Sequence, residues 1–452
     1  MTRGKTHARL DWLEYSHRFR KPNRTLLSVL ARSFLAGEPS VEQTFQRASL
    51  ALGRRWRWLR GVARRYLAMV HGRTRPRQRE VIEFLRNDEE FQSAWSEHSS
   101  EIRIQHWLTE PPQMQPVAAA ATWPLPVIET AGALAAWLEL EPDELDWFAD
   151  LKGLCRTSTR QHLGHYHYRV LTKPSGNVRL IEAPKPRLKE LQRRILAGIL
   201  EKIPPHTAVH GFLKGHSIKT FAAPHVGQSV VLRMDLEDFF PSFAAARIQT
   251  LFRTLGYPEL VADLLGGICT NAVPRAILKD PLYVRPHLPQ GAPSSPALAN
   301  LCTYRGDCRL LGLAQAAGAR YTRYADDLAF SGGKEFERSM EAFSTRAAAI
   351  LIEEGFTVNF RKTLVMRQGV RQHLAGLVAN ERLNVRRSDF DQLKAILTNC
   401  VRLGPESQNR DGHADFRAHL NGRVGFIEHI NPDKGRRLRA IFERIQWPRP
   451  LE

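Results

Sequence analysis

Residues 320–333 read Arg-Tyr-Thr-Arg-Tyr-Ala-Asp-Asp-Leu-Ala-Phe-Ser-Gly-Gly, and this stretch decides the fold. Aromatic and polar residues alternate on both sides of Ala325-Asp326-Asp327, a pattern typical of two strands joined by a tight turn. Because Asp favours turns, a polar hairpin turn is the simplest explanation of the two acids taken alone. Adjacent carboxylates are nevertheless costly unless a cation neutralises them. The pattern therefore predicts a β-hairpin that presents two carboxylates to a cation.

A third acid lies about ninety residues earlier, at the end of a short β-branched run. Residues 228–235 read Gln-Ser-Val-Val-Leu-Arg-Met-Asp, and the following Leu-Glu-Asp-Phe-Phe-Pro-Ser breaks the strand. Asp235 is thus expected at a strand end, where side chains become available to a cleft. Carboxylate oxygens suit Mg²⁺, which shares its ligands with substrate phosphates. A pair of such ions can activate an attacking hydroxyl and stabilise a leaving pyrophosphate oxygen.

The order of the motifs resembles that of reverse transcriptases: Asp235 with its following aromatics, then Leu288-Pro-Gln-Gly-Ala-Pro-Ser-Ser-Pro, then Tyr324-Ala-Asp-Asp. Residues 160–380, approximately, are similar to the fingers and palm of the bacterial retron-type branch. The resemblance implies an RNA-directed DNA polymerase of the α+β class with a right-hand architecture of fingers, palm and thumb. It also implies that Asp235, Asp326 and Asp327 are the catalytic residues and the ligands of two Mg²⁺ ions.

The same resemblance implies a set of nucleotide-binding residues. Phe240 matches the aromatic under the incoming sugar, where a ring would clash with a 2′-hydroxyl; an ordinary core phenylalanine is the alternative, because Phe239 and Phe243 are close by. Gln290 and Gly291 match the motif that borders nucleotide and template. Lys362 matches a lysine near the leaving pyrophosphate, or is simply an exposed lysine on a strand end.

The segment 170–181 is expected to form the fingers hairpin that grips the triphosphate, with Pro-Ser-Gly at its turn. Lys173 and Arg179 are the matching cations, because ammonium and guanidinium groups bind phosphate. Other basic residues near this hairpin compete for the role: Arg169, Lys185 and Arg187.

Two hallmarks of retron enzymes are imperfect here. An Asn-Ala-x-x-His element becomes Phe221-Ala-Ala-Pro-His225, in which His225 is retained as a candidate nucleic-acid contact. A Val-Thr-Gly element near the primer grip becomes Leu374-Ala375-Gly376. These departures leave the subfamily open, so a group II intron-like enzyme and another defence-associated reverse transcriptase remain alternatives. A catalytically inactive RNA-binding module is a third.

The chain has 452 residues and a formal net charge of +20, which points to a polyanionic partner. Residues 1–80 carry 19 Lys/Arg and 5 Asp/Glu, whereas residues 81–150 carry 2 and 14. The densest run lies between residues 54 and 79, with Trp56, Trp58 and Tyr66 among the arginines. Arginines with interleaved aromatics suit RNA, and the alternative is a solvated helix face whose aromatics pack inward. Its candidate RNA contacts are Arg54, Arg55, Arg57, Arg60, Arg64 and Arg65.

The distribution of charged residues and the position of the Pro/Ala-rich stretch suggest four segments. A helical N-terminal extension covers residues 1–111, a Pro/Ala-rich linker covers 112–128, fingers and palm cover 129–380, and a basic helical thumb covers 381–452.

No stretch of about 18 apolar residues occurs and no secretory leader is evident, so we expect a cytoplasmic protein without membrane integration. The resemblance implies four kinds of partner: a structured noncoding RNA that is template and primer, its DNA product, dNTPs and a toxin or effector protein. It also implies a role in anti-phage defence, with RNA-linked single-stranded DNA (msDNA) as the product.

Overall fold

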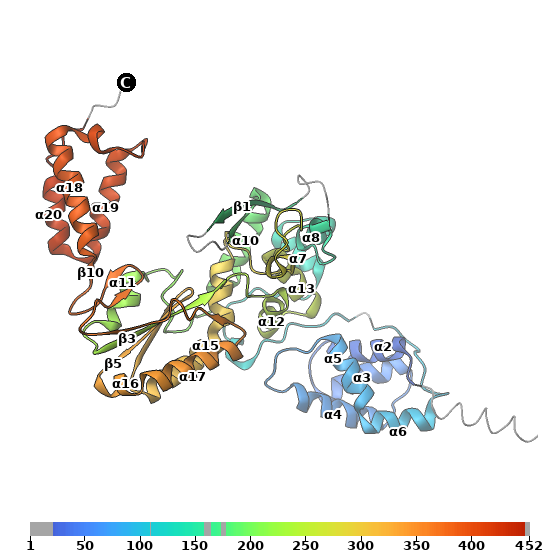
Figure 1. The fold of residues 1–452 in the computed structure, drawn as a ribbon. Coiled ribbons are helices and arrows are strands. Elements are labelled where there is room, and N and C mark those ends of the chain that lie inside the picture. Colours follow the sequence, from blue (N-terminus) through green and yellow to red (C-terminus); the bar gives the residue numbers. More distant parts are fainter. Residues whose placement is uncertain (1–20, 109, 158–163, 173–177, 448–452) are drawn as a thin grey trace, which may run out of the picture. The chain divides into compact units, whose positions relative to one another are not determined.

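The computed structural model describes residues 21–108, 110–157, 164–172 and 178–447. They combine helices with small antiparallel sheets (Figure 1). The chain divides into two compact units, 1–204 with 243–298 and 205–242 with 299–452. These units differ from the four linear segments expected from composition, because the chain passes between the units more than once.

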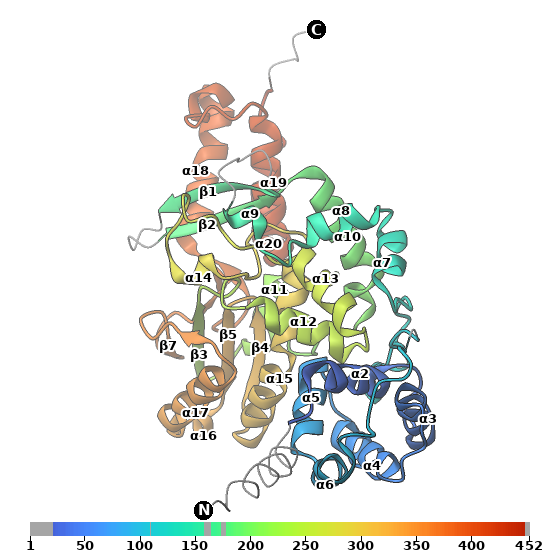
Figure 2. The same cartoon turned by 90° about the vertical axis from the view of Figure 1, so that its right-hand side faces the viewer.

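The first unit opens with a bundle of five helices (Figure 2): α2 (Arg24–Leu35), α3 (Val41–Leu52), α4 (Trp58–Val70), α5 (Gln78–Asn87) and α6 (Glu89–His98). The bundle has its own apolar core, in which Trp58 lies 5.4 Å from Phe91 and Phe34 lies 5.1 Å from Tyr66, between ring centroids. Side-chain caps begin α2 at Asn23 and α3 at Ser40. The helices expected over residues 25–70 are therefore present.

The rest of the first unit comprises short helices and one two-stranded sheet. Residues 112–128 contain only the 3₁₀ helix η1 (Ala118–Ala120). Helices α7 (Ala131–Leu138) and α8 (Pro142–Ala149) follow, and Pro142 occupies the first turn of α8, as its fixed φ favours. Strands β1 (Tyr166–Thr172) and β2 (Val178–Pro184) pair antiparallel, as the sequence predicts. The described residues of this unit also form α9 (Leu154–Thr157), α10 (Pro186–Gly198), the 3₁₀ helix η3 (Leu200–Lys202), α12 (Ala245–Thr254), α13 (Glu259–Cys269) and α14 (Pro281–Val284).

The second unit is built on an antiparallel sheet of order β4-β5-β3-β6, with β7 also paired to β3. Its strands are β3 (Val230–Glu237), β4 (Arg320–Tyr324), β5 (Asp327–Gly332), β6 (Thr357–Val358) and β7 (Leu364–Arg367). Helices α16 (Lys334–Arg338) and α17 (Met340–Glu353) pack on it through Phe336 and Phe343, which contact the ring of Phe330 or each other. The long helix α15 (Ser295–Ala316) spans the division between the units.

A buried ion pair lies directly beneath the hairpin turn of this sheet. Arg323 on β4 and Asp307 on α15 are both 0% exposed, and two guanidinium nitrogens donate to the two carboxylate oxygens at 2.7 Å. The third nitrogen donates to the carbonyl of Ala325 at 3.1 Å and to Asn300 Oδ1 at 3.2 Å. Burial lowers the pKa of Arg323, but Asp307 more than offsets this and raises it. A charged fork therefore holds the turn from inside the protein.

The C-terminal part of the second unit is a three-helix bundle (Figure 1) of α18 (Arg387–Leu403), α19 (Phe416–Ile430) and α20 (Pro432–Phe442). Leu397, Leu420, Val424 and Leu438 form its centre. Short strands precede it, β8 (His373–Leu374), β9 (Leu377–Val378) and β10 (Asn384–Val385), with α11 (Ile218–Ala222) and the 3₁₀ helix η4 (Ala223–His225) in the same unit. The helices expected after residue 381 are thus present.

Candidate active site

The three acids singled out by the sequence converge at one end of the sheet. Asp235 on β3 is the register partner of Asp327 on β5, so these two residues face each other across neighbouring strands. Tyr324 pairs with Asp327, which leaves Ala325 and Asp326 as a two-residue turn. Ala325 has φ +55°, an uncommon conformation for a residue with a side chain. The backbone N–H of Leu236 donates to the Asp326 carbonyl at 3.1 Å and fixes the turn against β3.

Two cationic side chains compensate two of the acids. Lys362 Nζ lies 3.0 and 3.2 Å from the carboxylate oxygens of buried Asp235, and Asn359 Nδ2 donates to the same carboxylate at 3.2 Å. Arg233 donates to Asp327 Oδ1 through Nε at 2.9 Å and Nη2 at 2.6 Å. Lys362 is 60% exposed, yet its ammonium group faces the acids, in contrast to the alternative of an unengaged surface lysine.

Asp326 is the acid whose charge the protein stabilises least. Burial raises its pKa to about 6, and the charges of Asp327 and Asp235 act in the same direction. Burial also raises the pKa of Asp327, although Arg233 opposes that effect. A carboxylate that is half-hidden from water beside two others attracts a cation.

Among the described residues, no three Asp, Glu, His or Cys side chains lie in a metal-binding arrangement. Asp235 and Asp327 are instead paired with Lys362 and Arg233. The donor chemistry itself fits Mg²⁺, since all three side chains are carboxylates and two of them, Asp326 and Asp327, have a raised pKa.

Phe240 is partly exposed, whereas its neighbours Phe239 and Phe243 are buried. Its ring lies 5.6 Å from that of Phe239 and 6.1 Å from that of Phe212, between centroids. It follows Asp235 by five residues, beyond the positive-φ residue Asp238, which turns the chain after β3. The alternative of an ordinary core phenylalanine is thus disfavoured by its exposure.

The other candidate nucleotide contacts belong to the first unit or lie outside the described residues. Gln290 is half-buried, and Gly291 is exposed with φ +136°. A Cβ on Gly291 would lie 2.7 Å from the Glu182 carbonyl oxygen, so only glycine fits there. Arg179 is exposed on β2. Lys173 lies outside the described residues.

The expectation that His225 contacts nucleic acid is wrong. Its side chain is 0% exposed, and the ring nitrogens lie 2.6 Å from Ser331 Oγ and 2.7 Å from Thr322 Oγ1. Burial lowers the pKa of His225 to about 3, so the ring stays neutral. The residue ties η4 to β4 and β5, and the retained histidine of the retron-like element is structural here.

The arginine-rich run is also arranged differently from the expectation of exposed, stacking aromatics. Trp56, Trp58 and Tyr66 are buried in the core of the helical bundle. Trp58 and Tyr66 lie eight residues apart on the inward face of α4, which excludes both rings from base stacking. The alternative in which the aromatics pack inward is therefore correct.

Acidic partners engage four of the six candidate arginines. Arg54 pairs with Glu101, and Arg55 and Arg60 pair with Glu42. Arg65 binds Asp88 bidentately and also Glu90. Within the described part of the chain, Arg57 and Arg64 are exposed without an ion pair.

Sequence reasoning missed three residues that hold the acids in place: Arg233, Asn359 and Arg323. Arg233 precedes Asp235 by two residues and therefore lies on the same face of β3, which is the one signal that could have found it. Asn359 and Arg323 act across elements that only the tertiary structure brings together.

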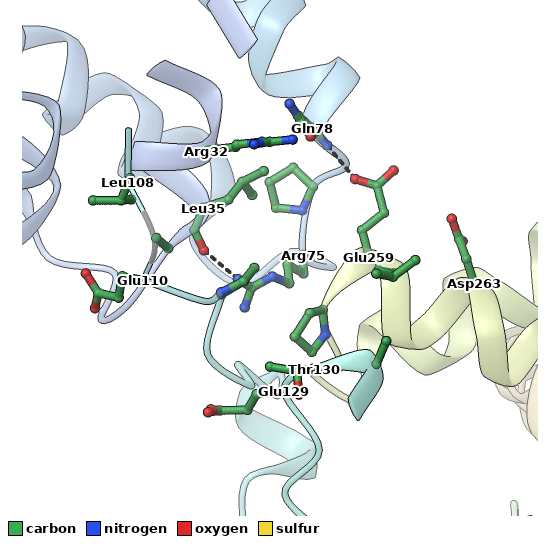
Figure 3. A pocket seen from close by; sticks show the side chains of 16 residues that line it. Arg32, Leu35, Arg75, Gln78, Leu108, Glu110, Glu129, Thr130, Glu259 and Asp263 are labelled. Atoms are coloured by element: carbon green, nitrogen blue, oxygen red, sulfur yellow. Dashed lines mark hydrogen bonds between the residues drawn. The ribbon is translucent and has the colours of Figure 1, made fainter. Parts of the chain in front are cut away.

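A separate cavity of about 540 Å³ lies in the first unit, between the helical bundle and the start of α13 (Figure 3). Arg75 crosses it and donates to the carbonyls of Leu35 and Gln113, while Glu259 accepts from the backbone N–H of Gln78 at 2.7 Å. The residues that the sequence singled out as nucleotide or metal ligands do not line this cavity.

Comparison with known proteins agrees with this geometry. Residues 171–386 match the family described as reverse transcriptase (RNA-dependent DNA polymerase). The chain is 41% identical over 326 residues to the Retron Mx65 reverse transcriptase of Myxococcus xanthus, covering 71% of this chain and 73% of that protein. It is 36% identical over 342 residues to the Retron Mx162 reverse transcriptase of the same organism, covering 71% and 67%. Against the Retron Ec86 reverse transcriptase of Escherichia coli the identity is 32% over 286 residues, covering 62% and 82%.

Three carboxylates at the end of an antiparallel sheet, inside a matching family segment, define an RNA-directed DNA polymerase. More narrowly, the chain belongs to the retron reverse transcriptases. The departures at Phe221 and Leu374-Ala375-Gly376 do not remove it from that family, and Phe221 is simply a buried core residue here. In the part of the chain that the structure describes, no helix is long and apolar enough to cross a bilayer.

The half-exposed ring of Phe240 generates a test of sugar selection. Phe240→Ala should raise the incorporation of ribonucleotides relative to deoxynucleotides by about tenfold or more, because it removes the group that would meet a 2′-hydroxyl. Competition between each NTP and its dNTP in primer extension measures the ratio. Phe426→Ala, which removes another part-exposed phenyl from α19, serves as the control. Equal sugar selectivity in Phe240→Ala and wild type would remove the assignment.

Proposed function

We propose that this reverse transcriptase copies part of a structured noncoding RNA into DNA that remains linked to the RNA (msDNA). The observation that carries the proposal is the convergence of Asp235, Asp326 and Asp327 at one sheet edge, each with a defined electrostatic environment. The relatives reported above are all retron reverse transcriptases, which supports the choice of product class. The proposed priming group is a 3′- or 2′-hydroxyl.

The proposed cofactor is a pair of Mg²⁺ ions held by the three carboxylates. When bound, the ions would activate the attacking hydroxyl and stabilise the leaving pyrophosphate oxygen. The protein's own residues do the rest. Arg233 orients Asp327, and Asn359 orients Asp235.

Lys362 is the proposed partner of the leaving pyrophosphate. Its exposed ammonium, held 3.0 Å from Asp235, is near enough to the acids to neutralise charge that develops on the pyrophosphate. Phe240, Gln290, Gly291 and Arg179 are the proposed contacts for the dNTP, together with Lys173 outside the described residues.

The proposed setting is the cytoplasm, in anti-phage defence, with a toxin or effector protein as a further partner. These proposals rest on the membership of the retron family and on the net charge of +20, which suits a protein that holds RNA. The right-hand architecture of fingers, palm and thumb is proposed on the same ground.

Asp326→Asn tests the function most simply. It should abolish dNTP incorporation with Mg²⁺, on poly(rA) primed with oligo(dT) and on RNA transcribed from the DNA beside the gene. RNA binding should persist, because the substitution removes one charge and no packing. Glu237→Gln, a change to an exposed acid at the end of β3, the strand that carries Asp235, is the matched control and should retain most activity.

The stability of the Asp326→Asn variant provides a check that the fold is intact. The pKa of Asp326 is raised in the folded state, so the metal-free protein loses stability as the pH rises from about 4 to about 6, and the loss persists at higher pH. At pH 8 without Mg²⁺ the variant should unfold at a higher temperature than wild type. The difference should vanish below about pH 4, where Asp326 is protonated and the substitution therefore removes no charge. DNA synthesis by Asp326→Asn at the wild-type rate, or loss of RNA binding together with synthesis, would contradict the assignment. A wild-type protein that binds RNA without incorporating dNTPs would indicate the inactive binding module instead.

Arg57 and Arg64 are the proposed RNA contacts of the helical bundle. They are exposed, Arg57 at the N-cap of α4 and Arg64 seven residues later on the same helix face, and within the described residues neither forms an ion pair. Because Trp56, Trp58 and Tyr66 are buried, these arginines can meet phosphates while the three rings are not available to stack a base. The other four candidates remain weaker proposals, since carboxylates already engage them.

Charge reversal tests this surface. Arg57→Glu with Arg64→Glu should weaken RNA binding by about tenfold and reduce the slope of log K against log salt by about 2, as expected for two lost phosphate contacts. The matched control is Arg86→Glu with Arg103→Glu, which changes the net charge equally at two other exposed arginines of the bundle. Fluorescence anisotropy at several salt concentrations gives both quantities. An equal loss in the two double variants would mean that only net charge matters, and would contradict the assignment.

A further inference from the structure

The carboxylate of Glu182, in the middle of β2, is buried completely although the chemistry described above does not use it. Its side chain is 0% exposed and lies on the same strand face as Leu180 and Pro184, which are also buried. Removing a carboxylate from water is costly unless donors replace the lost hydration. The groups that form hydrogen bonds with Glu182 therefore indicate the role of this buried carboxylate.

Three nitrogen atoms from one neighbouring region face this carboxylate. Asn271 Nδ2 donates to Oε1 at 2.8 Å, and His287 Nε2 lies 3.0 Å from Oε2. The third is the backbone N–H of Gln290, 3.4 Å from Oε2. The backbone N–H of Glu182 in turn donates to the Gln290 carbonyl at 2.9 Å, so Gln290 is bound to Glu182 through both of its peptide groups.

His287 is itself held rigidly. Its side chain is 1% exposed, and its Nδ1 donates to the Arg285 carbonyl at 2.8 Å. Its backbone exchanges two hydrogen bonds with Asn271, both of 2.9 Å. The ring thus has a single orientation, with Nε2 directed at Glu182. Asn271 and His287 together form a fixed frame behind the carboxylate.

The loop that contains Gln290 and Gly291 packs directly against the backbone of β2. A Cβ on Gly291 would lie 2.7 Å from the Glu182 carbonyl oxygen, closer than side-chain carbons approach. Arg179, another proposed dNTP contact, lies on the same strand three residues before Glu182. One strand therefore carries Arg179 and also fixes Gln290 and Gly291.

We propose that Glu182 is a positioning residue for the incoming nucleotide: its buried carboxylate holds the Gln290-Gly291 loop in register with the strand that carries Arg179. The inference rests on the proposed role of these three residues in dNTP binding. Glu182 acts through Gln290 and does not touch the substrate. Its loss should thus weaken dNTP binding and leave the chemical step nearly unaffected.

Glu182→Gln isolates this role because it preserves shape. The amide oxygen can accept from Asn271, and the amide NH₂ can donate to a neutral His287 at Nε2, since the proton on Nδ1 is used by Arg285. The N–H of Gln290 then faces a donor and loses its acceptor. We expect KM for dNTP to rise by about tenfold, with kcat within about threefold of wild type and RNA affinity unchanged.

The matched control is Gln192→Met on α10, in the same unit. Gln192 is also 0% exposed, and its Nε2 donates to Tyr166 Oη and to the Ile268 carbonyl at 2.9 Å, without contact to the loop. This variant should lower stability and leave KM for dNTP unchanged. An equal rise of KM for dNTP in both variants would show that any loss of stability in this unit weakens dNTP binding, and would overturn the proposal. A wild-type KM for dNTP in Glu182→Gln would also overturn it.

Hydrogen exchange of the full-length protein gives a readout that does not depend on polymerisation. In Glu182→Gln, peptides that cover residues 286–293 should exchange faster than in wild type, while peptides of the helical bundle should not change. Unaltered exchange in residues 286–293 would overturn the proposal for Glu182, whether or not the wild-type protein makes DNA. A wild-type protein that makes no DNA would instead count against the proposed function. Asn271→Ser, which removes one donor and keeps the carboxylate, should shift KM and exchange in the same direction by less.

Discussion

The buried pair of Arg323 and Asp307 is the interaction on which the proposed active site depends. Both residues are fully buried, and the guanidinium group uses the one nitrogen that Asp307 leaves free to donate to Asn300 and to the carbonyl of Ala325. Ala325 is the residue that must adopt positive φ so that Asp326 and Asp327 can follow it at the sheet edge. A buried ion pair contributes little net stability when it is complete, but an unpaired buried charge is very unfavourable. The pair therefore specifies one position for the turn.

The three acids at this edge of the sheet differ in how well the protein stabilises their negative charge. Asp235 and Asp327 have cationic partners in Lys362 and Arg233, whereas burial raises the pKa of Asp326. Such an arrangement costs stability in the absence of a cation, and functional sites commonly retain costs of this kind. In the first unit a second buried carboxylate, Glu182, fixes the loop of Gln290 and Gly291. In each unit a buried charge thus orders backbone next to proposed substrate contacts.

Much of this site could be predicted from the sequence because it depends on local patterns. The alternation around 320–333 gave the hairpin, the β-branched run gave the strand that ends at Asp235, and the spacing of Phe240 gave its place after that strand. The errors concern burial. Trp56, Trp58 and Tyr66 have the composition of an RNA-binding surface, but their spacing matches the inward face of a bundle. His225 matches the histidine of the retron element, but its buried ring forms hydrogen bonds with Ser331 and Thr322, about a hundred residues away. Contacts of that range, including Glu182 with His287, have no signature in a single sequence, and neither has the pairing of Arg323 with Asp307 across two elements.

The most direct test compares Arg323→Met with the double variant Arg323→Met, Asp307→Leu. The single substitution leaves Asp307 buried and unpaired, so it should destabilise the protein by about 3–5 kcal/mol. The double substitution removes both charges and should recover much of that stability in calorimetric unfolding. Primer extension at a temperature where the double variant is folded then decides the issue. If the guanidinium fork positions the catalytic turn, the double variant is stable but makes DNA at least tenfold more slowly than wild type; DNA synthesis at the wild-type rate would contradict that role.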